Sequence, residues 1–126
     1  MGVVLLSMLG QQITVEYLEH NDSFKSLLPR SGRIVREMSL TDWDGGWNLL
    51  QLDESFDYQH KIAEPYVFKN IHVTHLLIKS RWEGFAIGAA EPTSVFVLLV
   101  PDPSICVDGN ASSKDFIHVC WGTAHT

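Results

Sequence analysis

Short runs rich in valine, isoleucine and aromatic residues recur along this chain of 126 residues, and turn residues interrupt them within a few positions. Residues 13–17 alternate apolar and polar side chains, which is the period of a strand with one buried and one exposed face. Residues 95–100 are continuously apolar between Pro92 and Pro101, which predicts a central strand buried on both faces. The sequence therefore predicts a mainly β domain.

Turn chemistry places the other expected elements. Residues 42–46 contain two glycines, which reach positive φ without steric penalty, and they predict a hairpin between the strands on either side. Residues 53–65 show no clear period, so a loop or short helix is expected there. Ser23 could cap one short helical turn before Pro29. Further strands are expected over residues 33–40, 47–52, 66–81, 105–107 and 116–121, with a turn at 82–84 followed by apolar residues 85–87.

About seven short strands with frequent turns predict one domain over residues 1–126, folded as a small antiparallel barrel, roll or sandwich. A closed barrel removes exposed sheet edges, whereas an open sheet leaves edges that a second copy would cover. A twisted sheet with one helix against it is the alternative architecture. A homodimer is expected on this ground alone.

The charge balance narrows the classes of partner. Nine basic and fifteen acidic residues give a formal net charge of −6, which disfavours binding to nucleic acids or anionic membranes. Residues 2–9 are apolar but lack a basic flank and a cleavage pattern, so we expect them to belong to the folded domain. Two cysteines without an export signal predict a reduced, cytoplasmic protein.

Four tryptophans in a chain of this size are the strongest indication of a binding site. Tryptophan combines a large apolar face with one N–H donor, so several at strand ends can line a site for a small ligand or a partner's side chain. We expect Trp43, Trp47 and Trp82, with Arg81 beside the last, to form such a ligand-binding site. The competing interpretation is that they pack the core, where large aromatic residues dominate burial.

Histidines and cysteines offer weaker candidates. His72 and His75 lie three apart on an expected strand, so they should point to opposite faces and share no metal. A hairpin joining residues 105–107 to 116–121 would place Cys106 opposite Cys120, with His118 on the same face. That arrangement allows a zinc site, a disulfide or two inert thiols, and without a short Cys-x-x-Cys turn we expect no metal.

Charged segments suggest two other functions. Asp57, His60 and one of His72 or His75 could form a catalytic pocket for general acid and base chemistry. The acidic residues could instead form one surface that blocks a basic partner. These residues are Asp42, Asp44, Asp53, Glu54 and Asp57.

A basic turn at residues 30–33 is a further candidate, for an anion. Signatures of common hydrolases, nucleotide-binding proteins and zinc proteases are missing from the sequence, so no cofactor is expected and enzyme activity is undecided. The leading hypothesis is a noncatalytic binding domain for a small molecule or a protein.

Overall fold

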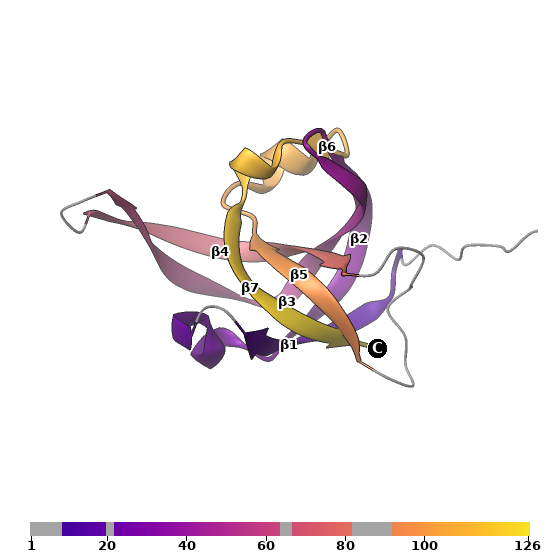
Figure 1. Cartoon of the computed structure of the whole chain (residues 1–126), viewed down its shortest axis with the longest axis horizontal. Helices are drawn as coiled ribbons and strands as arrows, with labels where there is room; N and C mark the ends of the chain where they lie inside the picture. The colour runs from indigo at the N-terminus through magenta and orange to yellow at the C-terminus, as the bar shows by residue number, and fades with distance from the viewer. Residues whose placement is uncertain (1–8, 20–21, 64–66, 82–91) are drawn as a thin grey trace, which may run out of the picture.

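The computed structural model describes residues 9–19, 22–63, 67–81 and 92–126, and in this part of the chain strands form one sheet with three short 3₁₀ helices (Figure 1). The strands are β1 (Gln12–Glu19), β2 (Arg30–Leu40), β3 (Trp43–Ala63), β4 (Val67–Ser80), β5 (Thr93–Leu99), β6 (Asn110–Ala111) and β7 (Ile117–His125). The helices are η1 (Asp22–Leu27), η2 (Pro103–Cys106) and η3 (Ser113–Asp115). No helix of the described residues is long and apolar enough to cross a membrane.

The sheet closes into a six-stranded antiparallel barrel. Its strand order is β1-β7-β5-β4-β3-β2, and β1 also pairs with β2 to complete the ring. The two-residue β6 adds to β2 as a parallel seventh strand. This confirms the predicted small, mainly β barrel. Closure also removes most of the open edges that motivated the homodimer, which stays a prediction.

All six barrel strands contribute to the inner core. Because alternate residues of a strand face opposite sides, Val95, Val97 and Leu99 of β5 point into the barrel. The other strands supply buried residues that include Ile13, Ile34, Leu50, Leu76 and Ala124. The expected central position of β5 is confirmed, since it pairs with β4 on one side and β7 on the other.

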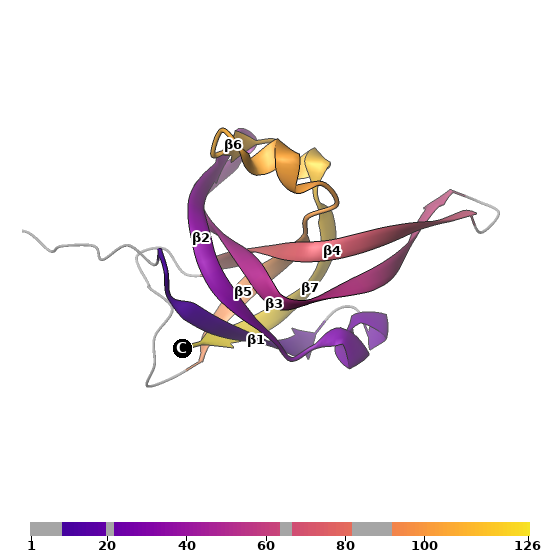
Figure 2. The ribbon, with the colours of Figure 1, turned by 180° about the vertical axis from the view of Figure 1, so that it is seen from behind.

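A second core lies on the outer face of the sheet. Leu49, Leu77 and Leu98 belong to it, and Cys106 and Phe116, from the segment between β5 and β7, pack against them. The short helices of this segment arch beside β6 in Figure 2. A register shift between Ile34 and Arg36 turns β2 from one face to the other, so Ile34 is in the inner core while Met38 and Leu40 are in the outer one.

The prediction of a loop or short helix at residues 53–65 is wrong for the described residues, because β3 continues through Ala63. From Gln51 to Phe56 the register advances five residues on β3 against two on β4, which breaks the alternation in sequence. Beyond this irregularity β3 and β4 form a two-stranded arm that projects from the barrel (Figure 1). The hairpin between β2 and β3 is confirmed, with Leu40 opposite Trp43.

The predicted C-terminal hairpin is also wrong. Residues 103–106 form η2, whose N-cap Asp102 accepts a hydrogen bond from the Ser104 N–H at 3.0 Å. The strand at β7 pairs with β5 and β1 instead, and Cys120 lies opposite Val97. Cys106 is therefore a buried free thiol in a helical turn and is not the cross-strand neighbour of Cys120.

Candidate aromatic binding surface

Four aromatic side chains, which we call the aromatic patch, contact one another on the outer face of the barrel. They are Trp43 and Trp47 of β3, Phe96 of β5 and Trp121 of β7. The ring centroids of Trp43 lie 5.6 Å from Trp47 and 5.4 Å from Phe96, and those of Phe96 and Trp121 are 5.2 Å apart. All three pairs are edge-to-face, an arrangement that favours contact between aromatic rings.

Strand register explains why residues so distant in sequence meet. Phe96 pairs with Lys79 of β4 on one side and with Trp121 of β7 on the other. Asn48 pairs with Ile78, so Trp47 occupies the next position along β3, beside Lys79. Trp47, Phe96 and Trp121 therefore lie in one row with Lys79, on the face that carries Leu77 and Leu98. The row crosses the neighbouring strands β3, β4, β5 and β7, and Trp43 lies further along β3, at the start of the strand.

The members of the patch differ in burial. Trp47 keeps only 1% of its surface exposed and belongs to the outer core, whereas Trp43, Phe96 and Trp121 are half-buried. Trp47 thus supports Trp43 from below, and the other three rings retain surface that a ligand can touch. Trp121 also makes a cation–π contact, because the guanidinium carbon of Arg81 lies 3.5 Å from the centroid of its ring.

The expected ligand-binding residues are therefore partly brought together. Trp43 lies at the surface of the patch, Arg81 stacks on Trp121, and Trp47 is beneath. Trp82 lies outside the described residues. Sequence reasoning missed Phe96, because a continuously apolar strand does not reveal which of its residues face outward.

Polar atoms are buried in the same layer. Lys79 is 9% exposed, and its Nζ donates to the Ser80 carbonyl at 3.3 Å. Its side chain lies over Gly45, where an added Cβ would be 2.7 Å from Cε. Within the described chain, Nε1 of Trp47 and Oγ of Ser94 are buried without a hydrogen-bond partner. Hydrogen-bond donors therefore concentrate beneath and beside the aromatic patch.

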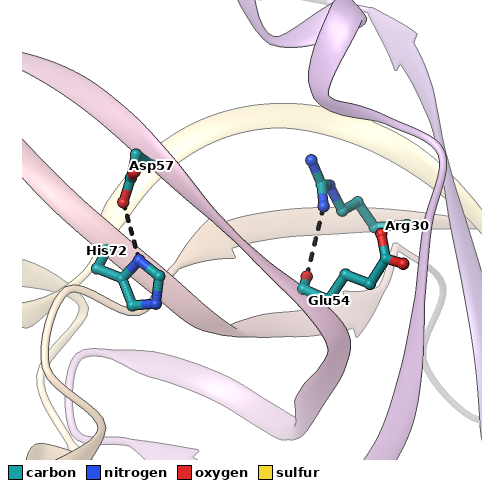
Figure 3. Close-up of polar contacts among 4 residues, drawn as sticks. All are labelled: Arg30, Glu54, Asp57 and His72. Atoms are coloured by element: carbon teal, nitrogen blue, oxygen red, sulfur yellow. Dashed lines mark hydrogen bonds and ion pairs between the residues drawn. The ribbon is translucent and has the colours of Figure 1, made fainter.

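The arm carries a carboxylate and imidazole in contact (Figure 3). Oδ1 of Asp57 lies 2.8 Å from Nδ1 of His72, as expected for residues paired directly across β3 and β4. Their side chains are 81% and 62% exposed, respectively. The side chain of His60, the third member of the expected pocket, lies outside the described part. Asp57 and His72 are thus brought together, on an open surface.

His75 lies apart from this pair. It is half-buried and its Nδ1 is 2.7 Å from Oγ1 of Thr74. Burial lowers the pKa of His75.

The basic segment at residues 30–33 is strand and not turn. Ser31 and Gly32 pair with β1, so they form no backbone nest for an anion. Arg30 lies 4.4 Å over the ring of Phe56 and donates through Nη1 to the Glu54 carbonyl at 3.4 Å (Figure 3). It also donates through Nε to the Leu27 carbonyl at 2.8 Å, so it joins three segments of the chain.

The acidic residues are dispersed. Asp42, at the tip of the β2–β3 hairpin, accepts hydrogen bonds from the side chain and backbone of Ser113, which lower its pKa. Asp53 accepts from Nε2 of Gln12 at 2.6 Å, and Asp57 lies on the arm. The side chain of Asp44 lies outside the described part.

The described residues contain no group of three or more histidine, cysteine or acidic side chains placed to hold a metal ion. Comparison of the chain with models of protein families, with curated proteins and with solved structures found no match. The functional argument therefore rests on the geometry of the aromatic patch and of the Asp57–His72 contact.

Proposed function

We propose that this chain is a noncatalytic binding domain that recognises a small ligand through the aromatic patch. The supporting observation is the continuous contact among Trp43, Phe96 and Trp121, each half-buried, above the fully buried Trp47. Partly exposed rings held in fixed positions offer a contact area at little cost in side-chain entropy. The barrel strands beneath them are well buried, so the surface is formed before a ligand arrives.

A screen by thermal shift, with tryptophan fluorescence recorded in parallel, tests this function. A ligand that binds only the folded state raises the apparent melting temperature, and one that touches the patch also changes tryptophan emission. Trp121→Leu removes one half-buried ring of the patch while keeping an apolar side chain. Tyr58→Leu, on the arm, is the matched control, because Tyr58 is also a partly buried aromatic residue.

The proposal requires ligands whose shift is lost in Trp121→Leu and kept in Tyr58→Leu. Equal shifts in both variants would place binding elsewhere and refute the aromatic patch as the site. If no small molecule gives a shift and a protein captured from solution binds in a Trp121-dependent way, the small-ligand class is wrong.

A catalytic function is the second candidate, supported by the 2.8 Å contact between Asp57 and His72. A carboxylate can orient an imidazole for general base chemistry. Both groups are largely exposed, however, so the described side chains form no wall that excludes water from the pair. Turnover of any substrate by the wild type that His72→Gln abolishes and His75→Gln retains would favour this candidate over the binding domain.

A further inference from the structure

We infer that the ligand of the aromatic patch carries an anionic group, which the ammonium of Lys79 binds while a flat apolar group of the ligand covers Trp43, Phe96 and Trp121. This inference rests on the proposed function and names the chemical class of its ligand. It rests primarily on the burial of the Lys79 side chain and on the single hydrogen bond that its ammonium makes in the described structure.

Lys79 is 91% buried, and in the described structure its ammonium makes one hydrogen bond, to the Ser80 carbonyl at 3.3 Å. An ammonium has three donors, and burying a charge is unfavourable unless it is paired. At 3.3 Å, the bond to the Ser80 carbonyl is also slightly longer than the usual range of about 2.7–3.2 Å for N–H···O hydrogen bonds. Lys79 thus has two donors left for an acceptor that a ligand would bring.

The position of this ammonium at the patch follows from the fold. Lys79 lies between Trp47 and Phe96 in the row across the sheet, and its end lies above Gly45, two residues from Trp43. Gly45 has a φ of 90°, and an added Cβ would lie 3.0 Å from Nζ. The absence of a side chain at Gly45 therefore makes the space in which the ammonium sits.

Two other polar groups of the described residues in this layer are also incompletely hydrogen-bonded. Nε1 of Trp47, which can only donate, and Oγ of Ser94 are buried without a hydrogen bond in the described residues. The Arg81 N–H donates to the Ser94 carbonyl, which makes these two residues cross-strand neighbours. The Ser80–Val95 pair separates them from the Lys79–Phe96 pair, so Ser94 and Phe96 lie on the same face of β5. The indole N–H can only donate and the Ser94 hydroxyl is able to donate, so both groups can bind an acceptor such as an anion.

Charge supports the same class of ligand. The whole chain carries a formal charge of −6, yet Lys79 and Arg81 lie beside the patch, and Arg81 is held over Trp121. A cation among aromatic rings attracts an anion from the water while the rings select an apolar body. A carboxylate and a phosphate share this chemistry.

Matched phenyl compounds test the inference, with binding followed by tryptophan fluorescence and by nitrogen–proton NMR. Phenylacetate and phenylacetamide have the same ring and nearly the same shape, and only phenylacetate is charged. The wild type should bind phenylacetate about tenfold more tightly, as expected for a charge-assisted hydrogen bond in a partly buried site. Phenyl phosphate tests the other headgroup, and the tighter of the two anions identifies the preferred one.

Variants assign the preference to one residue. Lys79→Met keeps an unbranched side chain over Gly45 and removes the charge, and Lys69→Met removes an exposed charge from the arm as the control. The preference for the anion should fall to less than about twofold in Lys79→Met, because one charge-assisted hydrogen bond is lost, and should persist in Lys69→Met.

Equal affinity of the wild type for acid and amide at the patch would overturn the anionic ligand and leave the binding function standing. An acid preference that survives Lys79→Met would overturn the role of Lys79. Failure of all three phenyl compounds to bind would overturn the inference whatever the screen finds, and a screen without a patch-dependent ligand would remove the proposed function as well.

Discussion

Substitution of Gly122 by alanine should destabilise the barrel by about 2 kcal/mol, because the two strands that flank it leave no room for a methyl group. Gly122 pairs with Tyr17 of β1 and Val95 of β5. An added Cβ would lie 2.6 Å from the carbonyl oxygen of Glu16 and 3.2 Å from Cγ2 of Val97. The Glu16 carbonyl would have to move away by roughly 0.8 Å to reach ordinary van der Waals contact. That movement would lengthen the β1–β7 backbone hydrogen bonds past the usual range of about 2.7–3.2 Å.

The magnitude combines opposing effects. Overpacking costs about 1–3 kcal/mol and a lost backbone hydrogen bond about 1 kcal/mol, while the reduced freedom of the unfolded chain returns about 0.4–1 kcal/mol. For a domain of this size, a net loss of about 2 kcal/mol corresponds to a fall in melting temperature of roughly 8 °C.

Urea unfolding followed by tryptophan fluorescence measures this loss. Gly46→Ala is the control, because no atom lies within 4 Å of its added Cβ and its φ is not positive. The control should unfold within about 0.5 kcal/mol of the wild type. If Gly122→Ala unfolded at the same urea concentration as the wild type, or if Gly46→Ala lost as much stability, the close approach of β1, β7 and β5 would be refuted. Closure of the barrel depends on that approach.

Three other predictions follow from single side chains. Lys79→Met should raise the stability of the ligand-free protein by up to about 1 kcal/mol in urea unfolding. The apolar methionine replaces a largely buried ammonium that has one long hydrogen bond. A loss of stability would contradict the view that the ammonium of Lys79 is poorly paired. His75 should titrate below the ordinary pKa of 6.5 in an NMR pH series, because burial lowers its pKa. Its contribution to the stability of the fold is therefore present above pH 6.5 and is lost as the pH falls through the folded pKa. A midpoint above 6.5 would show that His75 is not desolvated. Asp42→Asn should weaken the decline in melting temperature below about pH 4, because the lowered pKa of Asp42 gives a stabilisation that is lost as the pH falls through its folded value, and an unchanged acid profile would show that the Ser113 hydrogen bonds do not persist in solution.

Local patterns were sufficient to predict a mainly β fold, with a small barrel among the three architectures expected. The alternation in β1 and the apolar run in β5 report burial on one face and on two faces directly, and the glycines after Asp42 mark the β2–β3 hairpin. These patterns depend only on residues close in sequence, so the strands and the turn that they predict do not require knowledge of the strand order.

The failures have a common physical origin in irregular pairing. The arm was missed because the register shift between Gln51 and Phe56 breaks the period of β3, although its hydrogen bonds to β4 continue beyond. The helix η2 was missed because Ile105, Cys106 and Val107 have strand propensity, while Asp102 and Pro103 start a helical turn that lets Cys106 reach the outer core.

The candidate site was predictable only in part. The abundance of tryptophan pointed to Trp43. Arg81 was included because it precedes Trp82 in the sequence, yet its guanidinium lies over the ring of Trp121. Phe96 and Lys79 join the site through strand order, which periodicity does not encode. Sequence therefore identified the residue type and missed the row of side chains that register assembles.

The most direct test of the proposed function is a nitrogen–proton NMR titration of the wild type with the strongest ligand from the thermal-shift screen. A binding domain that acts through the aromatic patch predicts shifts of the indole signals of Trp43 and Trp121 and of the backbone signal of Phe96, with the arm residues Asp57 and His72 unchanged. Shifts confined to Asp57 and His72, with the patch unmoved, would contradict it.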